Sequence, residues 1–131
     1  MPTVDRYVTP LTNTSLSADE RRVLERFVEA LRGELGDDLC SVWLYGSRAR
    51  GEPPHPGSDV DVLVIIRQSD WFQDVGRVNG VLWAAAQAED VEPYRFSAHV
   101  GDIEWVEGRR AIRSFFIQEV DRDKIVLEGD E

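Results

Sequence analysis

The fold is decided by the stretch from Leu39 to Ile66, LCSVWLYGSRARGEPPHPGSDVDVLVII. An apolar run comes first, followed by a Gly-Ser turn, a loop rich in Pro and Gly, and a second apolar run that opens with two aspartates. Short runs of β-branched and aromatic residues bounded by turn residues predict two strands, over Leu39–Tyr45 and Asp59–Ile66. The later half of the second run is apolar on both faces, which is typical of a central strand in a covered sheet.

Helical patterns lie on both sides of this stretch. Ser17 and Glu20 match a capping box, in which each side chain accepts a backbone N–H of the other residue, at the start of a helix over Ala18–Leu35. A second helix is predicted from its N-cap residue Asp70 to about Glu89.

The remaining chain predicts one strand, two helical segments and an edge strand. The strand covers Tyr94–Val100, a short helical piece covers Ile103–Glu107, and Lys124–Leu127 forms the edge strand. Apolar residues mark a last helix after Gly108: Ile112, Phe115, Phe116 and Val120. This order predicts an α/β fold, with a small mixed sheet flanked by helices. We assign residues 1–14 to an N-terminal arm and residues 15–131 to a single domain.

Length and composition fit one compact domain, because the chain has 131 residues and 42% hydrophobic composition. The longest uninterrupted apolar run, Val62–Ile66, is far shorter than the roughly 20 residues that span a bilayer. Met1–Pro10 lacks the apolar region of a signal peptide. We therefore expect a soluble cytoplasmic protein with no membrane partner. Cys40 is the only cysteine, which excludes an intrachain disulfide.

The charge balance narrows the class of partner. The 25 acidic and 15 basic residues give a formal net charge of −10. This charge repels a polyanion at long range and argues against direct nucleic-acid binding. A nucleotide delivered with magnesium is compatible with it, because the metal offsets phosphate charge locally.

The turn between the first two strands is suited to phosphate. Gly46 and Ser47 follow the first strand and precede a predicted helical turn at Arg48–Arg50. A glycine here lets the backbone approach a phosphate closely, while the serine hydroxyl and the free N–H groups of a helix start supply hydrogen-bond donors.

Two carboxylates open the second strand. Asp59 and Asp61 point to the same face and lie roughly 6.6 Å apart along the chain. Such a pair destabilises the fold unless a cation lies between the charges, and Mg²⁺ fits because it prefers carboxylate oxygens and keeps positions open for phosphate. Two Mg²⁺ ions about 4 Å apart would activate an attacking hydroxyl and stabilise a leaving pyrophosphate. Asp59 and Asp61 are therefore the predicted catalytic and metal-binding residues.

The stretch Gly46–Val64 resembles the signature of minimal nucleotidyltransferases in the DNA polymerase β-like superfamily. The matching residues are Gly46-Ser47-Arg48-Ala49-Arg50-Gly51, Ser58-Asp59-Val60-Asp61 and Val62-Leu63-Val64. The resemblance implies a polymerase β-like palm fold, in which the Gly-Ser turn holds the triphosphate of an NTP and the Asp-x-Asp pair binds magnesium. It also implies transfer of an NMP group, commonly AMP from ATP, to an acceptor hydroxyl. Many small members are antitoxins that AMPylate a tyrosine of a partner HEPN toxin, so such a toxin is the implied protein partner.

The motif supplies the predicted nucleotide-binding residues: Gly46, Ser47, Arg48, Arg50 and Ser58. For Arg48 and Arg50, phosphate binding competes with a solvated or aspartate-paired role.

The third carboxylate that the family usually has on the next strand is not evident. The polar face of the predicted strand Tyr94–Val100 carries three side chains: Arg95, Ser97 and His99. Ser97 and His99 are the candidates for the third site position, and His99 is either a hydrogen-bonded structural residue or a catalytic base. Glu92 and Asp102 flank this strand.

Three functions follow as hypotheses. The first is an active nucleotidyltransferase that modifies a protein hydroxyl. The second is a degenerate relative that neutralises a partner protein by binding alone, which the missing carboxylate favours. The third is a transferase that modifies an antibiotic or another small molecule.

Overall fold

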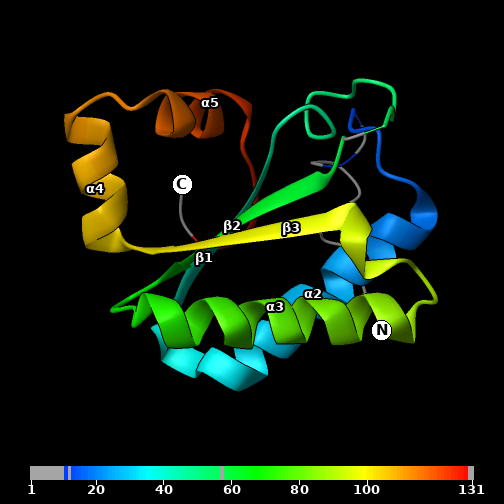
Figure 1. The fold of residues 1–131 in the computed structure, drawn as a ribbon, viewed down its shortest axis with the longest axis horizontal. Coiled ribbons are helices and arrows are strands. Elements are labelled where there is room, and N and C mark those ends of the chain that lie inside the picture. The colour runs from blue at the N-terminus through cyan, green and yellow to red at the C-terminus, as the bar shows by residue number, and fades with distance from the viewer. Residues whose placement is uncertain (1–10, 12, 57, 130–131) are drawn as a thin grey trace, which may run out of the picture.

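A four-stranded sheet lies between two pairs of helices in the computed structural model, which describes residues 11, 13–56 and 58–129 (Figure 1). The strands are β1 (Leu39–Tyr45), β2 (Val60–Ile66), β3 (Phe96–Asp102) and β4 (Ile125–Gly129). The α-helices are α2 (Ala18–Leu35), α3 (Trp71–Ala88), α4 (Ile103–Ala111) and α5 (Phe115–Asp123). Two short 3-10 helices cover Gly36–Asp38 and Pro93–Arg95. This architecture confirms the predicted α/β fold.

The sheet is mixed, with the order β3-β2-β1-β4. β2 runs antiparallel to β1 and parallel to β3, while β4 pairs antiparallel with the other side of β1. β2 therefore occupies a central position, as its apolar sequence predicts.

Each face of the sheet buries its own apolar cluster. Helices α2 and α3 cover one face, and α4 and α5 cover the other (Figure 1). The larger cluster joins α2 to the first face and includes Phe27, Leu31, Leu44, Val62 and Val64. The smaller cluster lies under α4 and α5 and includes Trp43, Tyr45, Leu63, Ile117 and Val120. Because strand side chains alternate, Tyr45 and Asp61 belong to the α4–α5 side of the sheet.

The first helix has the bounds that the sequence predicts. The hydroxyl of Ser17 accepts the N–H of Glu20 at 3.1 Å, and the Glu20 carboxylate accepts the N–H of Ser17 at 2.9 Å. Gly36 ends the helix with φ = 56°, in the left-handed region that glycine tolerates.

The N-cap of α3 differs in detail from the prediction. Asp70 occupies the cap position, but its side chain makes no capping hydrogen bond. The carboxylate of Asp74 instead accepts the N–H of Asp70 at 3.0 Å and the hydroxyl of Ser69 at 3.0 Å. The N–H of the cap residue itself is thus bound by a side chain from the first turn of the helix.

The predicted third strand begins two residues too early. Pro93–Arg95 form a 3-10 turn, so Tyr94 lies outside the strand and its side chain is 74% exposed. Phe96, Ala98 and Val100 do pack toward the α2–α3 face, as the predicted alternation requires. The strand itself extends to Asp102.

The predicted boundaries of the last two helices were also wrong. α4 continues through Gly108 to Ala111, and α5 begins at Phe115, where Ser114 accepts the N–H of Ile117 at 3.2 Å. Ile112, which the prediction placed in the last helix, lies in the turn between α4 and α5, and Phe115 at the start of α5 is 88% exposed. Periodicity alone did not reveal this turn, because apolar residues continue across it.

Most of the predicted N-terminal arm lies outside the described residues. Leu11, which the prediction placed in the arm, is fully buried in the larger cluster. None of the described helices combines the length and the apolar character that a membrane crossing needs.

Candidate functional site

The C-terminal end of β1 and the N-terminal ends of β2 and β3 lie side by side and bring the predicted site residues together. Tyr45 at the end of β1 pairs with Asp61, and Asp61 pairs with Ser97 near the start of β3. Since β1 runs antiparallel to β2, its C-terminal turn Gly46-Ser47 lies beside the start of β2, where Asp59 and Asp61 are found. The structure thus assembles the predicted motif from both strands.

The turn packs directly against the second carboxylate. Gly46 has φ = 84°, and a Cβ added to it would lie 2.9 Å from Oδ2 of Asp61. The N–H of Arg50 donates to the carbonyl of Gly46 at 3.1 Å, and the N–H of Glu52 donates to that of Ser47 at 3.0 Å. These bonds close the chain into the predicted helix-like turn, whose first N–H groups have no partner within the turn. Glycine is therefore required here for close approach to Asp61 as well as for backbone conformation.

The two carboxylates differ in their surroundings. Asp59 is exposed, whereas Asp61 is half-buried. Burial, and secondly the negative charge of Asp59, raises the pKa of Asp61 to about 6. The two side chains offer only oxygen ligands, and Gly46 lets the turn approach Oδ2 of Asp61 closely because a Cβ there would lie 2.9 Å from that atom. Both properties fit a hard divalent cation such as Mg²⁺, which would relieve the repulsion between the two charges.

His99 and Tyr45 form a hydrogen-bonded pair on the same side of the sheet. Nδ1 of His99 lies 2.8 Å from the Tyr45 hydroxyl, and the Phe116 ring packs on both side chains. Burial lowers the pKa of His99. Burial, followed by the charges of Asp61 and Glu119, raises the pKa of the Tyr45 phenol. The pair is therefore a neutral hydrogen bond near Asp61 at physiological pH.

Neither flanking carboxylate completes the pair as a third ligand. Glu92 forms an ion pair with Arg95 at 2.8 Å. Asp102 caps α4 by accepting the N–H of Trp105 at 2.8 Å, and it pairs with Ile66, five residues and roughly 16 Å along the strands from the Asp61–Ser97 pair. In the described part of the chain, no group of three or more His, Cys, Asp or Glu side chains is placed to hold a metal ion.

The predicted phosphate-binding arginines are both engaged in ion pairs. Arg48 is buried and pairs with the equally buried Glu20 at the start of α2. Arg50 pairs with Glu52 at 2.6 Å and with Asp123 of α5 at 2.5 Å. For Arg50 this is the aspartate-paired alternative. Arg48 follows neither alternative, because its partner is a glutamate in the protein interior.

Ser58 forms two hydrogen bonds within the loop before β2. Its hydroxyl donates to the carbonyl of His55 at 2.8 Å and accepts the N–H of His55 at 2.8 Å, next to Asp59. Sequence reasoning missed two neighbours of the site, Glu20 and Tyr45. The capping box signalled Glu20 only as a helix-start residue, and Tyr45 was assigned only to its strand.

Comparison with solved structures shows the same fold at low sequence identity. A chain from a mutant of the toxin-antitoxin MntA-HpeT matches with a TM-score of 0.50 and 17% identity over 79% of this chain and 72% of that chain. A chain from a second mutant of MntA-HpeT matches with a TM-score of 0.48 and 19% identity, over 82% of this chain and 73% of that chain. No curated protein matches this chain.

The sequence as a whole agrees with the local motif. The family model for the nucleotidyltransferase domain matches residues 24–128, which run from α2 to β4 and include the whole carboxylate and glycine site. The chain therefore belongs to the nucleotidyltransferase domain family.

Proposed function

We propose that the chain is a magnesium-dependent nucleotidyltransferase that moves an NMP group, in the first place AMP from ATP, to a hydroxyl acceptor. The observation that carries this proposal is the close packing of the Gly46 turn on Asp61, with Asp59 beside it, in a chain of the nucleotidyltransferase domain family. This arrangement places hydrogen-bond donors for phosphate beside carboxylate ligands for a metal. It requires no covalent nucleophile from the protein.

The proposed roles follow from the geometry. The turn at Gly46 and Ser47 orients the triphosphate through backbone N–H groups and the serine hydroxyl. Asp59 and Asp61 hold the divalent cations. When bound there, Mg²⁺ supplies positive charge that favours a deprotonated acceptor hydroxyl and a departing pyrophosphate. The acceptor oxygen forms a bond to the α-phosphorus, the α–β bridging P–O bond breaks, and the hydroxyl proton leaves to solvent or a nearby base.

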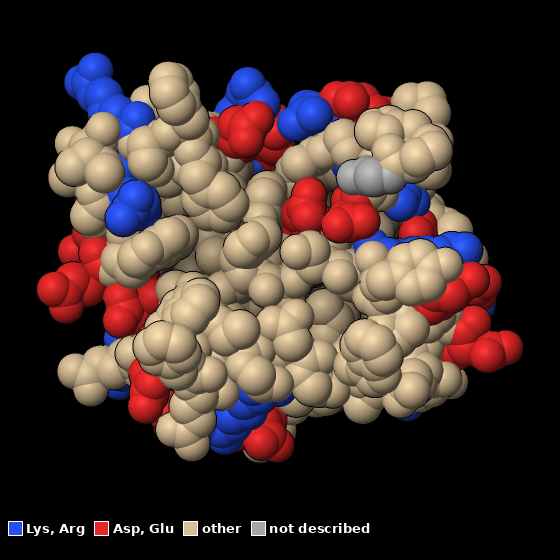
Figure 2. Space-filling view, viewed as in Figure 1, with Lys and Arg blue, Asp and Glu red and all other residues tan. Residues whose placement is uncertain are grey.

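A protein acceptor suits the surface beside the site. Figure 2 shows a largely uncharged face where β3 lies between α3 and α4. A groove of about 390 Å³ along this face is walled by Trp71, Trp105 and Phe116 and includes His99. Exposed aromatic surface of this kind is typical of protein interfaces. We therefore propose that the acceptor is a hydroxyl of a partner protein. Because the motif resembles that of minimal nucleotidyltransferases, and the matched structures are of a toxin-antitoxin pair, we further propose that this partner is a HEPN-type toxin modified at a tyrosine and that this chain acts as the antitoxin.

The test is transfer of label from [α-³²P]ATP with Mg²⁺ to the product of the neighbouring gene. Wild-type protein is expected to label the acceptor, and Asp59→Asn combined with Asp61→Asn is expected to lower the rate at least about 100-fold, because the cation ligands are lost. A matched control is Asp37→Asn with Asp38→Asn, a double change in the exposed turn before β1. Undiminished labelling by the Asp59/Asp61 variant would sink the proposal.

A second candidate function is a binding module that inhibits its partner without chemistry. The specific observation in its favour is that Asp102 caps α4 and Glu92 pairs with Arg95, which leaves the pair of aspartates without an evident third carboxylate. Partner inhibition that persists in EDTA and without nucleotide would support this function over transfer. Inhibition that strictly requires both would rule it out.

A further inference from the structure

A second cavity, which shares no lining residue with the His99 groove, opens beside Asp59. Its volume is about 480 Å³. The walls come from three separate parts of the chain: the start of α2, the Gly46 turn with the loop before β2, and the 3-10 turn before β3. Asp59 and Tyr94 are both among the lining residues.

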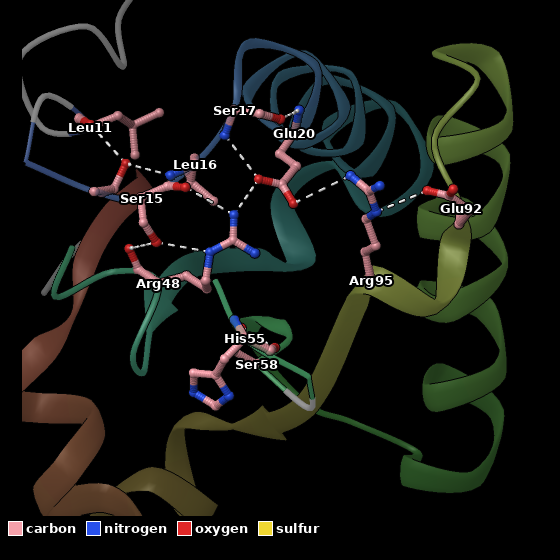
Figure 3. A network of polar contacts seen from close by, with 11 residues as sticks. Leu11, Ser15, Leu16, Ser17, Glu20, Arg48, His55, Ser58, Glu92 and Arg95 are labelled. Atoms are coloured by element: carbon pink, nitrogen blue, oxygen red, sulfur yellow. Dashed lines mark hydrogen bonds and ion pairs between the residues drawn. The ribbon is translucent and has the colours of Figure 1, made fainter. Parts of the chain in front are cut away.

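One wall of the cavity is locked by a buried ion pair. Figure 3 shows the Arg48 guanidinium between Ser15 and Glu20, and Arg95 between Glu20 and Glu92. Nε of Arg48 donates to the Ser15 hydroxyl at 2.8 Å, and an Nη2 hydrogen donates to the Ser15 carbonyl at 2.9 Å. Since these groups satisfy one another, the wall is preformed before any ligand arrives.

The charges that line the cavity balance. Arg48 and Arg95 contribute two positive charges, and Glu20 and Asp59 contribute two negative charges. A cavity without excess positive charge does not select a triphosphate, in contrast to the N–H groups of the Gly46 turn. Its preferred occupant is an uncharged group that needs stacking and hydrogen bonds.

The uncharged part of the lining meets both needs. The Tyr94 ring is 74% exposed, and Pro54 and Pro56 add apolar surface. The hydroxyl of Ser17 accepts the N–H of Glu20 and keeps its own proton available for donation. An aromatic face with nearby hydroxyl donors is suited to a nucleobase and a ribose.

We propose that this cavity receives the base and ribose of the donor nucleotide, with the base stacked on Tyr94. The inference rests on the proposed function, because Asp59, which would hold a cation of the bound triphosphate, also lines the cavity. The groove at His99 is a poorer match, since neither Asp59 nor Asp61 is among its lining residues, whereas Asp59 lines the cavity. In this proposal the cavity beside Asp59 binds the nucleoside of the donor, and the groove at His99 binds the acceptor.

The test compares the affinities of the full chain for ATP and for inorganic tripolyphosphate by calorimetry in Mg²⁺. Tyr94→Ala is expected to weaken ATP binding at least about fivefold, the loss expected for one base stack, and to leave tripolyphosphate binding unchanged. Tyr94→Phe keeps the ring and is expected to bind ATP like the wild type. Phe72→Ala is the matched control, because Phe72 is 86% exposed on α3 and does not line the cavity.

The outcomes separate this inference from the proposed function. If the wild type binds both ligands and Tyr94→Ala binds ATP normally, the cavity is not the nucleoside site and the proposed function stands. An equal loss of ATP and tripolyphosphate binding by Tyr94→Ala also overturns the inference, because the effect then acts on the phosphates. A wild-type chain that binds neither ligand overturns the proposed function, and this inference with it.

Discussion

The environment of Asp61 in the folded protein disfavours the ionised form of its carboxyl group. Asp61 is half-buried, packed under Gly46, and close enough to Asp59 for that charge to contribute to its raised pKa of about 6. A residue kept in an unfavourable ionisation environment is a common property of functional sites. Here the unfavourable charge is what would make a divalent cation bind.

Asp61→Asn is expected to raise the melting temperature by a few degrees at pH 7.5 in EDTA, because it removes that charge. The effect depends on pH in a defined direction. The stability contributed by protonated Asp61 is fully present below the ordinary pKa of 3.8 and is lost as the pH rises through about 6. The difference between variant and wild type should therefore grow between pH 4 and pH 7, as measured by thermal unfolding followed by circular dichroism.

In Mg²⁺ the wild type should have a higher melting temperature than Asp61→Asn, the reverse of the order expected in EDTA. A cation that binds only the folded wild type raises its melting temperature, while Asp61→Asn should gain little. Asp59→Asn serves as the comparison in EDTA, since Asp59 is exposed and its removal should stabilise the chain less. A melting difference between wild type and Asp61→Asn that stays constant from pH 4 to pH 7.5 would contradict the assigned ionisation.

At the scale of elements, the start of α2 holds the Gly46-Ser47 turn in place. Glu20 belongs to the capping box of α2 and also accepts the buried guanidinium of Arg48, which follows the Gly46-Ser47 turn. The carbonyl of Arg48 accepts the N–H of Ser15 at 3.0 Å, which adds a backbone link. A helix-start residue therefore also anchors the loop that reaches the site.

Arg48→Met is expected to lower the free energy of unfolding by about 3 kcal/mol, because the buried Glu20 carboxylate loses its close ion pair and keeps only the 3.9 Å contact with Arg95. Urea unfolding measures this loss. Combining Arg48→Met with Glu20→Gln should recover part of it, since no uncompensated charge then remains. Arg77→Met is the matched control, because the Arg77–Glu34 pair is exposed and contributes at most about 1 kcal/mol. Equal losses in the two single variants would refute the structural role of Arg48.

At the scale of the whole molecule, the proposed nucleotide site is a small region of a chain whose formal net charge is −10. The net charge of −10 repels polyanions over the whole surface, while the Gly46 turn and the carboxylate pair form one small region that a cation can neutralise. This charge distribution agrees with the proposed binding of a nucleotide with its metal and argues against binding of a long nucleic acid.

We accordingly expect no binding of a short DNA duplex at 0.15 M salt up to about 100 µM protein, the weak end of typical non-specific affinity. Fluorescence anisotropy of a labelled duplex measures this, and the ATP titration of the same preparation shows that the protein is competent to bind. Salt-sensitive binding of the duplex at micromolar protein would show that local positive charge outweighs the net charge.

Local sequence signals determined the elements whose ends are set by short-range bonds. The capping box of Ser17 and Glu20 and the conformation of Gly36 set the bounds of α2, and the apolar run before Gly46 set those of β1. Where no such signal existed, as between α4 and α5, the predicted ends were wrong: α4 runs on to Ala111, and Ile112 lies in the turn before α5.

By itself, the sequence determined the fold class, the family and the grouping of Gly46, Ser47, Asp59 and Asp61, because a turn and a two-residue spacing are local. Tertiary structure alone decided the partner of Arg48, the use of Asp102 as a helix cap and the cavity beside Asp59. The physical reason is that these features join side chains from segments far apart in the chain. Packing, which spacing does not record, sets the distances between them.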